Sequence, residues 1–326
     1  MHQYQLHGLC VQTEAALDGY RATELPAGGL PDLRVELAGA RPVPDEVPPG
    51  LLVQSHTSPS PSRRGSYSTA RLPDGGLVVR AHGAVDFELG PDLRLARAWV
   101  GPGHDPALVW LLVPGLLVSV LLGLRGELVL HASAVEAGGR ALALSAPPGV
   151  GKSTVAALAC SVGARLVTDD VLRVDLGSGT PRCYLGAARS RLRRPAGELS
   201  PTYARASVPT SSDGRYLLEA PASELELAPL SALVLPVPAR DRDELVLRAV
   251  TGHRAVLELA RALRVQGWRD EAVNRQMFLA ITRLAATVPL LRALVPWGPP
   301  FDPAVSLRLL EQTGLVPGPR PAPPTA

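Results

Sequence analysis

Residues 146–154 read APPGVGKST, the most informative segment of the chain for its fold class. Its Lys152 is the only lysine in the chain, since every other basic side chain is an arginine. The stretch fits the phosphate-binding loop pattern G-x-x-x-x-G-K-[ST], with Ala146 in place of the first glycine. Lysine suits such a loop because a slender chain ending in a compact ammonium reaches between phosphates, whereas a planar guanidinium collides with the loop. The one lysine therefore stands where arginine is least able to replace it.

The sequence on either side of the loop predicts the strand and helix that the motif requires. RALALSA, at residues 140–146, is an apolar run typical of a strand, and STVAALACSVGA, at residues 153–164, is typical of a helix. The alternative is a glycine-rich turn that happens to precede a helix. We predict a nucleotide site in which Ser153 also offers its hydroxyl to Mg²⁺. The predicted nucleotide-binding residues are Pro148, Gly149, Val150, Gly151, Lys152, Ser153 and Thr154.

An acidic pair follows the predicted helix. RLVTDD, at residues 165–170, indicates a short strand that ends in Asp169 and Asp170. The two strands of a right-handed β-α-β unit are parallel, so the acids are expected at the same sheet edge as the loop. One carboxylate can then hold Mg²⁺ while the other accepts a proton from an incoming hydroxyl. The alternative is an acidic pair that only turns the chain.

A histidine is brought toward the loop by a predicted hairpin. Residues 128–146, LVLHASAVEAGGRALALSA, read as two strands joined at Gly138 and Gly139. If these glycines form the turn, the register sets His131 opposite Ala146, the first residue of the loop. The alternative is a hydrogen-bonded core histidine without a chemical role.

Three motifs, LHASAV, APPGVGKS and LVTDD, resemble the HPr kinase/phosphorylase superfamily, and more closely its peptide-tailoring relatives such as the lasso-peptide kinases. They cover about residues 128–174, with the order and spacing of the family. The resemblance implies that Asp169 is the general base, that Asp170 lies at the metal, and that His131 lies beside Lys152 on the phosphates. It implies ATP and Mg²⁺ as cofactors.

The chain also departs from that family. Thr154 stands where HPr kinases tend to have Glu, and the later signature used for phosphorolysis is missing. The resemblance therefore implies neither the reverse reaction nor HPr as the substrate. A basic run at residues 189–195, RSRLRRP, predicts an acceptor-binding site at Arg191, Arg193 and Arg194. The alternative for this run is a solvated loop.

The remaining sequence predicts an α/β chain: a small β-rich N-terminal domain, then a P-loop kinase domain with a central, mostly parallel β-sheet. The predicted boundaries are 1–105, 106–298 and a Pro-rich segment at 299–326. Apolar runs predict N-terminal strands at 33–37, 50–54, 75–83 and 85–90. Later periodicity predicts core-facing helices at 253–266 and 271–287, the second with Met277, Ile281, Leu284 and Val288 on its inner side.

Composition narrows the class of protein. The net charge is only +3 and aromatics are 4% of residues, which does not favour nucleic-acid binding. Three cysteines without C-x-x-C spacing favour neither a disulfide scaffold nor zinc, and no secretory signal is recognised, so a reducing cytoplasm is expected. The uncharged segment 107–124 is predicted to be a buried helix rather than a membrane span.

The expected function is ATP-dependent phosphorylation of a hydroxyl on a peptide or small protein, and a serine hydroxyl is the acceptor that we expect. A kinase for a small molecule such as free serine fits the same motifs. A nucleotide-binding regulatory protein without phosphotransfer is the alternative outside enzymology. A homo-oligomer is compatible with all three.

Overall fold

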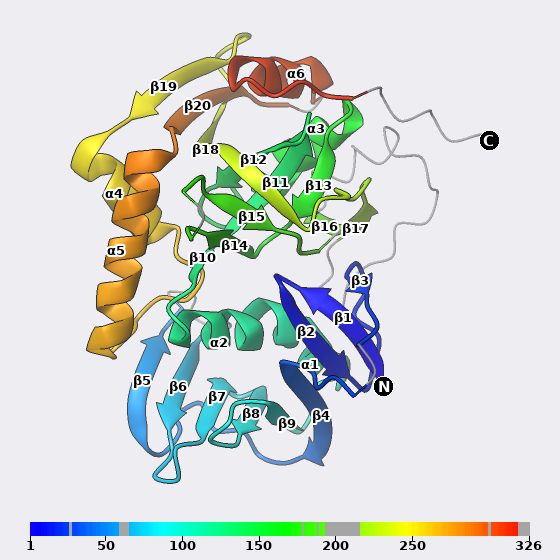
Figure 1. The fold of residues 1–326 in the computed structure, drawn as a ribbon, viewed down its shortest axis with the longest axis vertical. Helices are drawn as coiled ribbons and strands as arrows, with labels where there is room; N and C mark the ends of the chain where they lie inside the picture. Colours follow the sequence, from blue (N-terminus) through cyan, green and yellow to red (C-terminus); the bar gives the residue numbers. More distant parts are fainter. Residues whose placement is uncertain are drawn as a thin grey trace, which may run out of the picture. The chain divides into compact units, whose positions relative to one another are not determined.

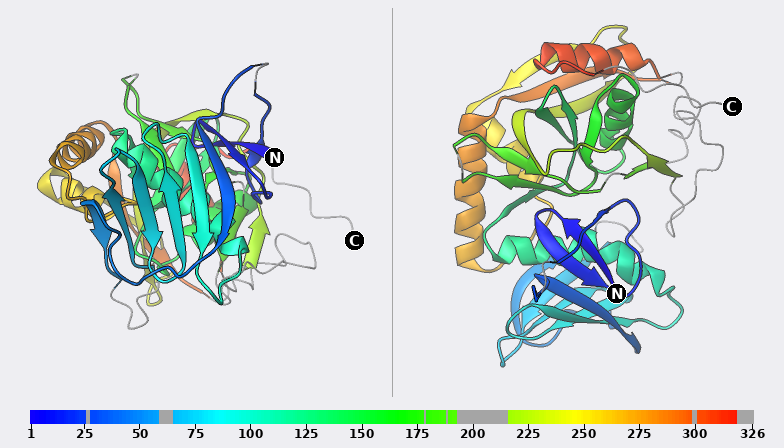
Figure 2. Two further views of the ribbon diagram at one scale, coloured as in Figure 1. Left: turned by 90° about the horizontal axis from the view of Figure 1, so that it is seen from below. Right: turned by 45° about the vertical axis from the view of Figure 1, so that its right-hand side comes forward.

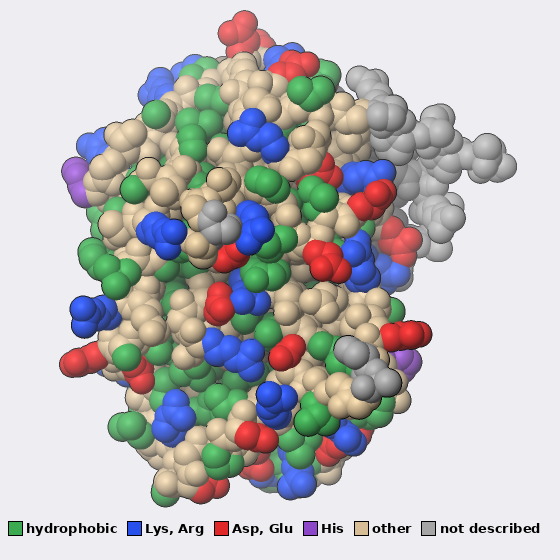
Figure 3. Space-filling model, viewed as in Figure 1, with side chains coloured by type: hydrophobic (Ala, Val, Ile, Leu, Met, Phe, Trp, Pro, Cys, Tyr) green, Lys and Arg blue, Asp and Glu red, His purple; other side chains and the backbone are tan. Residues whose placement is uncertain are grey.

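The computed structural model describes residues 1–25, 28–58, 65–177, 179–187, 189–192, 216–298 and 301–318. The chain is a mixed α/β protein that divides into two compact units (Figure 1; Figure 3 shows the same view with side chains coloured by type). Unit 1 comprises Met1–Glu127 and Val265–Phe278, and unit 2 comprises Leu128–Arg264 and Leu279–Ala326. The division thus falls at Glu127, whereas the sequence suggested residue 105.

Unit 1 is built on a nine-stranded sheet in the order β3-β1-β2-β4-β9-β8-β7-β6-β5, seen from below in Figure 2. Its pairings are antiparallel except for β2–β4 and β4–β9. The four predicted runs became β4, β5, β7 and β8, which confirms a β-rich N-terminal unit. The strands are β1 (His2–Leu6), β2 (Leu9–Thr13), β3 (Arg21–Ala22), β4 (Leu33–Ala40), β5 (Leu51–His56), β6 (Tyr67–Arg71), β7 (Leu77–Ala81), β8 (Val85–Leu89) and β9 (Leu95–Val100).

The apolar segment of unit 1 is helical along its whole length. It comprises α1 (Ala107–Leu112), a π-helical turn η1 (Val113–Leu117) and α2 (Val118–Leu124). Pro114 lacks an N–H and its ring crowds the preceding turn, so the wider π-turn lets the helix pass it. Among the described residues this is the one helix long and apolar enough to span a membrane, and 61% of it is buried. The burial is consistent with the predicted core helix.

The second segment of unit 1 is tied to β5 through backbone groups. Ser55 N donates to Gly267 O at 2.9 Å, and Arg269 N donates to Val53 O at 2.8 Å. Gly267 has φ +75°, and a Cβ there would lie 1.9 Å from Ser55 O, so only glycine fits. Residues 265–278 therefore complete the edge of a sheet whose strands all come from the first hundred residues.

Unit 2 is built on a sheet in the order β10-β14-β15-β18-β12-β11-β13, with β20 beside β18 and β19 beside β20. The prediction of a mostly parallel sheet is wrong, because only β12–β18 and β18–β20 are parallel pairs among its described strands. Short hairpins reverse the chain at β11–β12 and β14–β15, and such links require antiparallel pairing. The strands are β10 (Leu128–Leu130), β11 (Ala132–Ala137), β12 (Arg140–Ser145), β13 (Arg165–Thr168), β14 (Leu172–Asp175), β15 (Arg182–Tyr184), β18 (Leu227–Ala239), β19 (Val246–Val250) and β20 (Leu290–Pro296), while β16 (Arg189–Leu192) and β17 (Tyr216–Glu219) form a separate ladder.

Helices cover both faces of this sheet. They are α3 (Lys152–Ser161), α4 (Gly252–Arg261), α5 (Glu271–Thr287, which begins in unit 1) and α6 (Pro303–Gln312). The side chains of β12 alternate: its alanines pack in a core with residues of α4 and α5, and its leucines in a core with residues of α3 and α6. This period of two confirms the strand predicted before the loop, and it fixes the start of α3 against the sheet.

The two late helices were predicted with unequal accuracy. The second has the predicted bounds, 271–287, and its residues Met277, Ile281 and Leu284 are buried as expected. The first ends at Arg261 rather than Gln266. It ends there because Ala262 O accepts from His131 N at 2.6 Å and Arg264 N donates to Val129 O at 2.9 Å, which draws the chain onto β10.

Candidate active site

The predicted loop lies between β12 and the first residue of α3, Lys152. Two of its glycines adopt left-handed backbone angles, Gly149 with φ +86° and Gly151 with φ +111°. Gly151 also lies against the Trp297 ring, because a Cβ there would be 2.1 Å from Trp297 Cη2. The strand, loop and helix thus follow one another as predicted, while phosphate binding by the loop stays a prediction.

Strand directions bring the other predicted residues to the same edge. Both β12 and β13 pair antiparallel with β11, so they run parallel to one another with β11 between them. Their carboxyl ends, which lead to the loop and to Asp169, therefore emerge together. The hairpin register is also confirmed, because Ala132 pairs with Ser145. His131 immediately precedes β11 and consequently lies at this edge too.

His131 links the lysine to one of the acids. Lys152 Nζ lies 2.9 Å from His131 Nε2, and His131 Nδ1 lies 3.2 Å from both Asp170 O and Asp170 Oδ1. Burial lowers the pKa of His131 to about 4; Asp170 opposes this shift, while Lys152 and Arg264 reinforce it. His131 is therefore neutral at pH 7. An ammonium only donates, so Nε2 accepts from Lys152 and Nδ1–H donates to Asp170.

Asp169 faces the loop hydroxyl. Its Oδ1 accepts from Ser153 Oγ at 2.8 Å and from Ser133 Oγ at 2.5 Å, and the side chain is nearly buried. Ser133, on β11, was missed by sequence reasoning. The available signal was its place two residues after His131, since alternate residues of a strand share a face.

Asp170 is paired with an arginine. Arg264 Nη2 lies 3.2 Å from Asp170 Oδ2, and the Asp170 side chain is 30% exposed. Asp170 has φ +72°, a left-handed angle that is rare outside glycine and is often found at functional sites. Arg264 was also missed, because it lies 94 residues along the chain and is positioned by its backbone bond to β10. No local pattern identifies it.

The residues beside the loop fit a magnesium ion that also binds phosphate oxygens. Mg²⁺ in nucleotide sites is commonly held by one or two carboxylates together with phosphates and water. Ser153 and Asp169 supply neighbouring oxygens of this kind. The sequence assigned the metal to Ser153 and Asp170, and that assignment stays a prediction; in the structure Asp170 contacts His131 and Arg264. Among the described residues, no cluster of three or more His, Cys, Asp or Glu could hold a metal ion unaided.

The predicted acceptor-binding arginines lie where the structure describes no side chains. Arg191 belongs to β16, which pairs with β17, and its side chain is outside the description. Arg193 and Arg194 lie outside the described residues. Their role stays a prediction.

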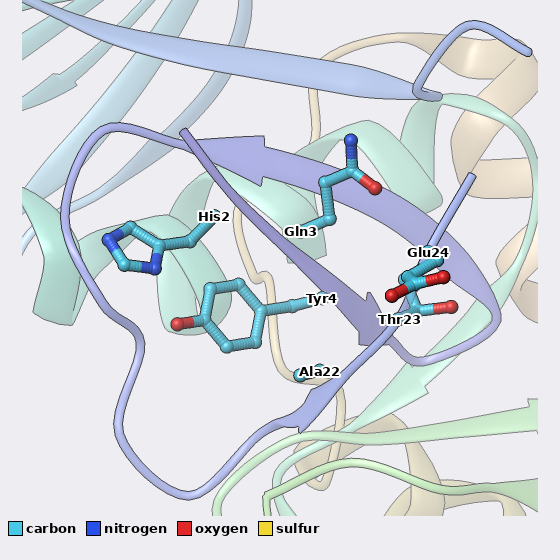
Figure 4. A pocket seen from close by; sticks show the side chains of 6 residues that line it. All are labelled: His2, Gln3, Tyr4, Ala22, Thr23 and Glu24. Atoms are coloured by element: carbon cyan, nitrogen blue, oxygen red, sulfur yellow. The ribbon is translucent and has the colours of Figure 1, made fainter. Parts of the chain in front are cut away.

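A separate hollow in unit 1 has a volume of about 330 Å³ (Figure 4). The His2 and Tyr4 rings lie at one side of it, with centroids 6.3 Å apart. Its lining comes from β1 and the chain around β3, namely His2, Gln3, Tyr4, Ala22, Thr23 and Glu24. None of these six residues is among the described ones that converge on the loop, which belong to unit 2.

Comparison with known proteins leaves the family open. No family model matches the chain, and no curated protein matches it. Among solved structures, the HPr(Ser) kinase/phosphatase from Coxiella burnetii is similar at 10% identity with a TM-score of 0.32, covering 56% of this chain and 94% of that one. Similarity at this level carries no argument about activity, so the chemistry of the site rests on its own geometry.

Proposed function

We propose that this protein is an ATP-dependent phosphotransferase that moves the γ-phosphoryl group to a hydroxyl, with serine of a peptide or small protein as the expected acceptor. The observation that carries the proposal is two sets of contacts between neighbouring residues of the same two segments: Lys152 to His131 to Asp170, and Ser153 to Asp169. Peptide tailoring in the cytoplasm, as in lasso-peptide biosynthesis, is the setting that we propose.

Catalysis of phosphoryl transfer requires mainly that the reacting groups are positioned and that the negative charge of the phosphates is neutralised. Lys152 would contact the terminal phosphates, with neutral His131 orienting its ammonium without adding a competing charge. The backbone N–H groups of the loop and the start of α3 would contact the remaining phosphate oxygens. Ser153 and Asp169 would hold Mg²⁺, which when bound neutralises charge on the phosphates.

The contacts favour Asp170 as the general base, which exchanges the two roles assigned from sequence. Asp170 is the more exposed acid, and Arg264 and His131 hold its carboxylate from two sides. In the proposed step, the acceptor oxygen bonds to the γ-phosphorus and the bond to the β,γ-bridging oxygen breaks. The hydroxyl proton passes to Asp170, and ADP leaves with the electron pair of the broken bond.

Transfer of label from γ-labelled ATP tests the proposal. Serine peptides, matched alanine peptides and free serine would be offered as acceptors, and products identified by mass spectrometry. Lys152→Ala and Asp169→Asn should each nearly abolish transfer, whereas Arg308→Ala, which removes an exposed cation on α6, should not. If ATP binds yet label reaches no acceptor, the protein is a nucleotide-binding regulator instead. Labelling of free serine alone would indicate a small-molecule kinase.

A further inference from the structure

Four strands of unit 2 point their carboxyl ends to the edge that carries the loop. β12 and β13 run the same way, β18 is parallel to β12, and β20 is parallel to β18. Trp297 follows β20. Its backbone N–H donates a hydrogen bond, 3.2 Å long, to the carbonyl oxygen of Ala239, the last residue of β18. Ligands of open α/β sheets bind at such an edge. The topology therefore places Trp297 beside the loop independently of any motif.

The indole of Trp297 lies directly on the loop. The three atoms nearest a Cβ built at Gly151 are Trp297 Cη2, Cζ2 and Cζ3, at 2.1, 2.6 and 3.0 Å, all on the six-membered ring. Gly151 is the residue before Lys152 and the N-cap of α3. The ring thus meets the backbone at the point where a phosphate chain would enter the helix N-terminus.

A second aromatic side chain fixes the indole. Phe301 meets Trp297 edge to face, with ring centroids 5.2 Å apart and an interplanar angle of 87°. Phe301 also packs against a small core that includes Ala157 and Leu158 of α3. Both rings are only partly buried. Since the whole chain has just four Trp and three Phe, two of them at the loop form an uncommon local concentration.

We infer that Trp297, held by Phe301, is the platform on which the base of the bound nucleotide stacks. The inference rests on the proposed function, because it takes the phosphates to lie in the loop. A base is tethered to those phosphates through the ribose and must lie near the loop. Aromatic platforms accept bases through their π-faces and discriminate little between purines. The residue would thus contribute affinity for the nucleoside part of the ligand rather than for its phosphates.

Binding of ATP, GTP and inorganic tripolyphosphate, each with Mg²⁺, separates these contributions. Trp297→Ala should weaken ATP and GTP roughly tenfold to a hundredfold and leave tripolyphosphate nearly unchanged, whereas Trp297→Phe should retain most nucleotide affinity. Trp110→Ala, in unit 1, is the matched loss of an indole and should change none of the three. Thermal melting of each variant verifies folding.

Two results would overturn the inference while leaving the proposed function intact. Equal weakening of tripolyphosphate and ATP by Trp297→Ala would mean that the indole only supports the loop. Unchanged ATP affinity would mean that the base binds elsewhere. If the native protein binds neither ATP nor tripolyphosphate, the proposed function itself fails and the platform with it.

Discussion

Acidification should destabilise this protein through His131. Burial lowers the pKa of His131 from 6.5 to about 4 in the folded protein, while the unfolded chain has the ordinary value. Between these values the unfolded state binds a proton that the folded state does not, so stability falls as pH decreases from about 6.5 to about 4. From pH 7.5 to pH 4.5 the expected loss from this one group is about 2–3 kcal/mol.

The variant His131→Gln isolates that loss, because glutamine does not titrate and can still accept from Lys152. Over the same pH interval the native protein should lose more stability than the variant, corresponding to a larger fall in melting temperature by roughly 3–5 °C. Thermal denaturation followed by circular dichroism at both pH values measures the difference. His253→Gln, which changes an exposed histidine on α4, should behave like the native protein.

An equal fall in the native protein and in His131→Gln would refute the reasoning. Nuclear magnetic resonance offers an independent reading. The imidazole signal that is missing in His131→Gln should titrate near pH 4 in the native protein. A midpoint near 6.5 would show that the ring is accessible to water and that its contact with Lys152 is transient.

Three further predictions concern the loop and its acids. Lys152→Arg keeps the charge but should lower transfer roughly a hundredfold, measured with γ-labelled ATP, and near-native rates would contradict the argument from shape. Asp169→Asn should raise the Mg²⁺ concentration needed for half-maximal nucleotide binding, measured by calorimetry. Asp170→Asn should lower kcat and leave that Mg²⁺ concentration unchanged. The opposite pattern would restore the roles that were assigned from sequence. Gly151→Ala should destabilise the fold by roughly 1–3 kcal/mol in urea denaturation, because its φ is +111° and its new Cβ would collide with the Trp297 ring. A variant of unchanged stability would show that the ring moves freely.

The local sequence was sufficient to predict the fold wherever short-range geometry determines the structure. The pair Gly138-Gly139 fixes a two-residue turn, and the observed register follows from it. Periodicity was sufficient for α5, whose inner residues recur at helical spacing. It was insufficient for the sheet of unit 2, because strand order there depends on pairings between distant segments such as β15 with β18. The helix α4 was overextended because tertiary hydrogen bonds, rather than propensity, end it.

The candidate site divides in the same way. Lys152, Ser153 and the two aspartates could be identified from motifs, because a loop and the strand that follows its helix have fixed relative positions. The motifs could not identify which of the two aspartates contacts Ser153, because the direction of each side chain depends on the local backbone, and Asp170 has a left-handed φ. Arg264 and Trp297 reach the site through long-range pairing of β10 and β20 with their neighbours, and neither lies in a recognisable motif.

The return of residues 265–278 to unit 1 has a consequence for biosynthesis. A ribosome that has released the first 127 residues has delivered every strand of the N-terminal sheet but not the segment whose Gly267 and Arg269 bond to β5. During synthesis the edge strand β5 therefore lacks these hydrogen bonds until more than a hundred further residues have emerged. A fragment cut at Glu127 would keep this exposed border permanently and be prone to self-association.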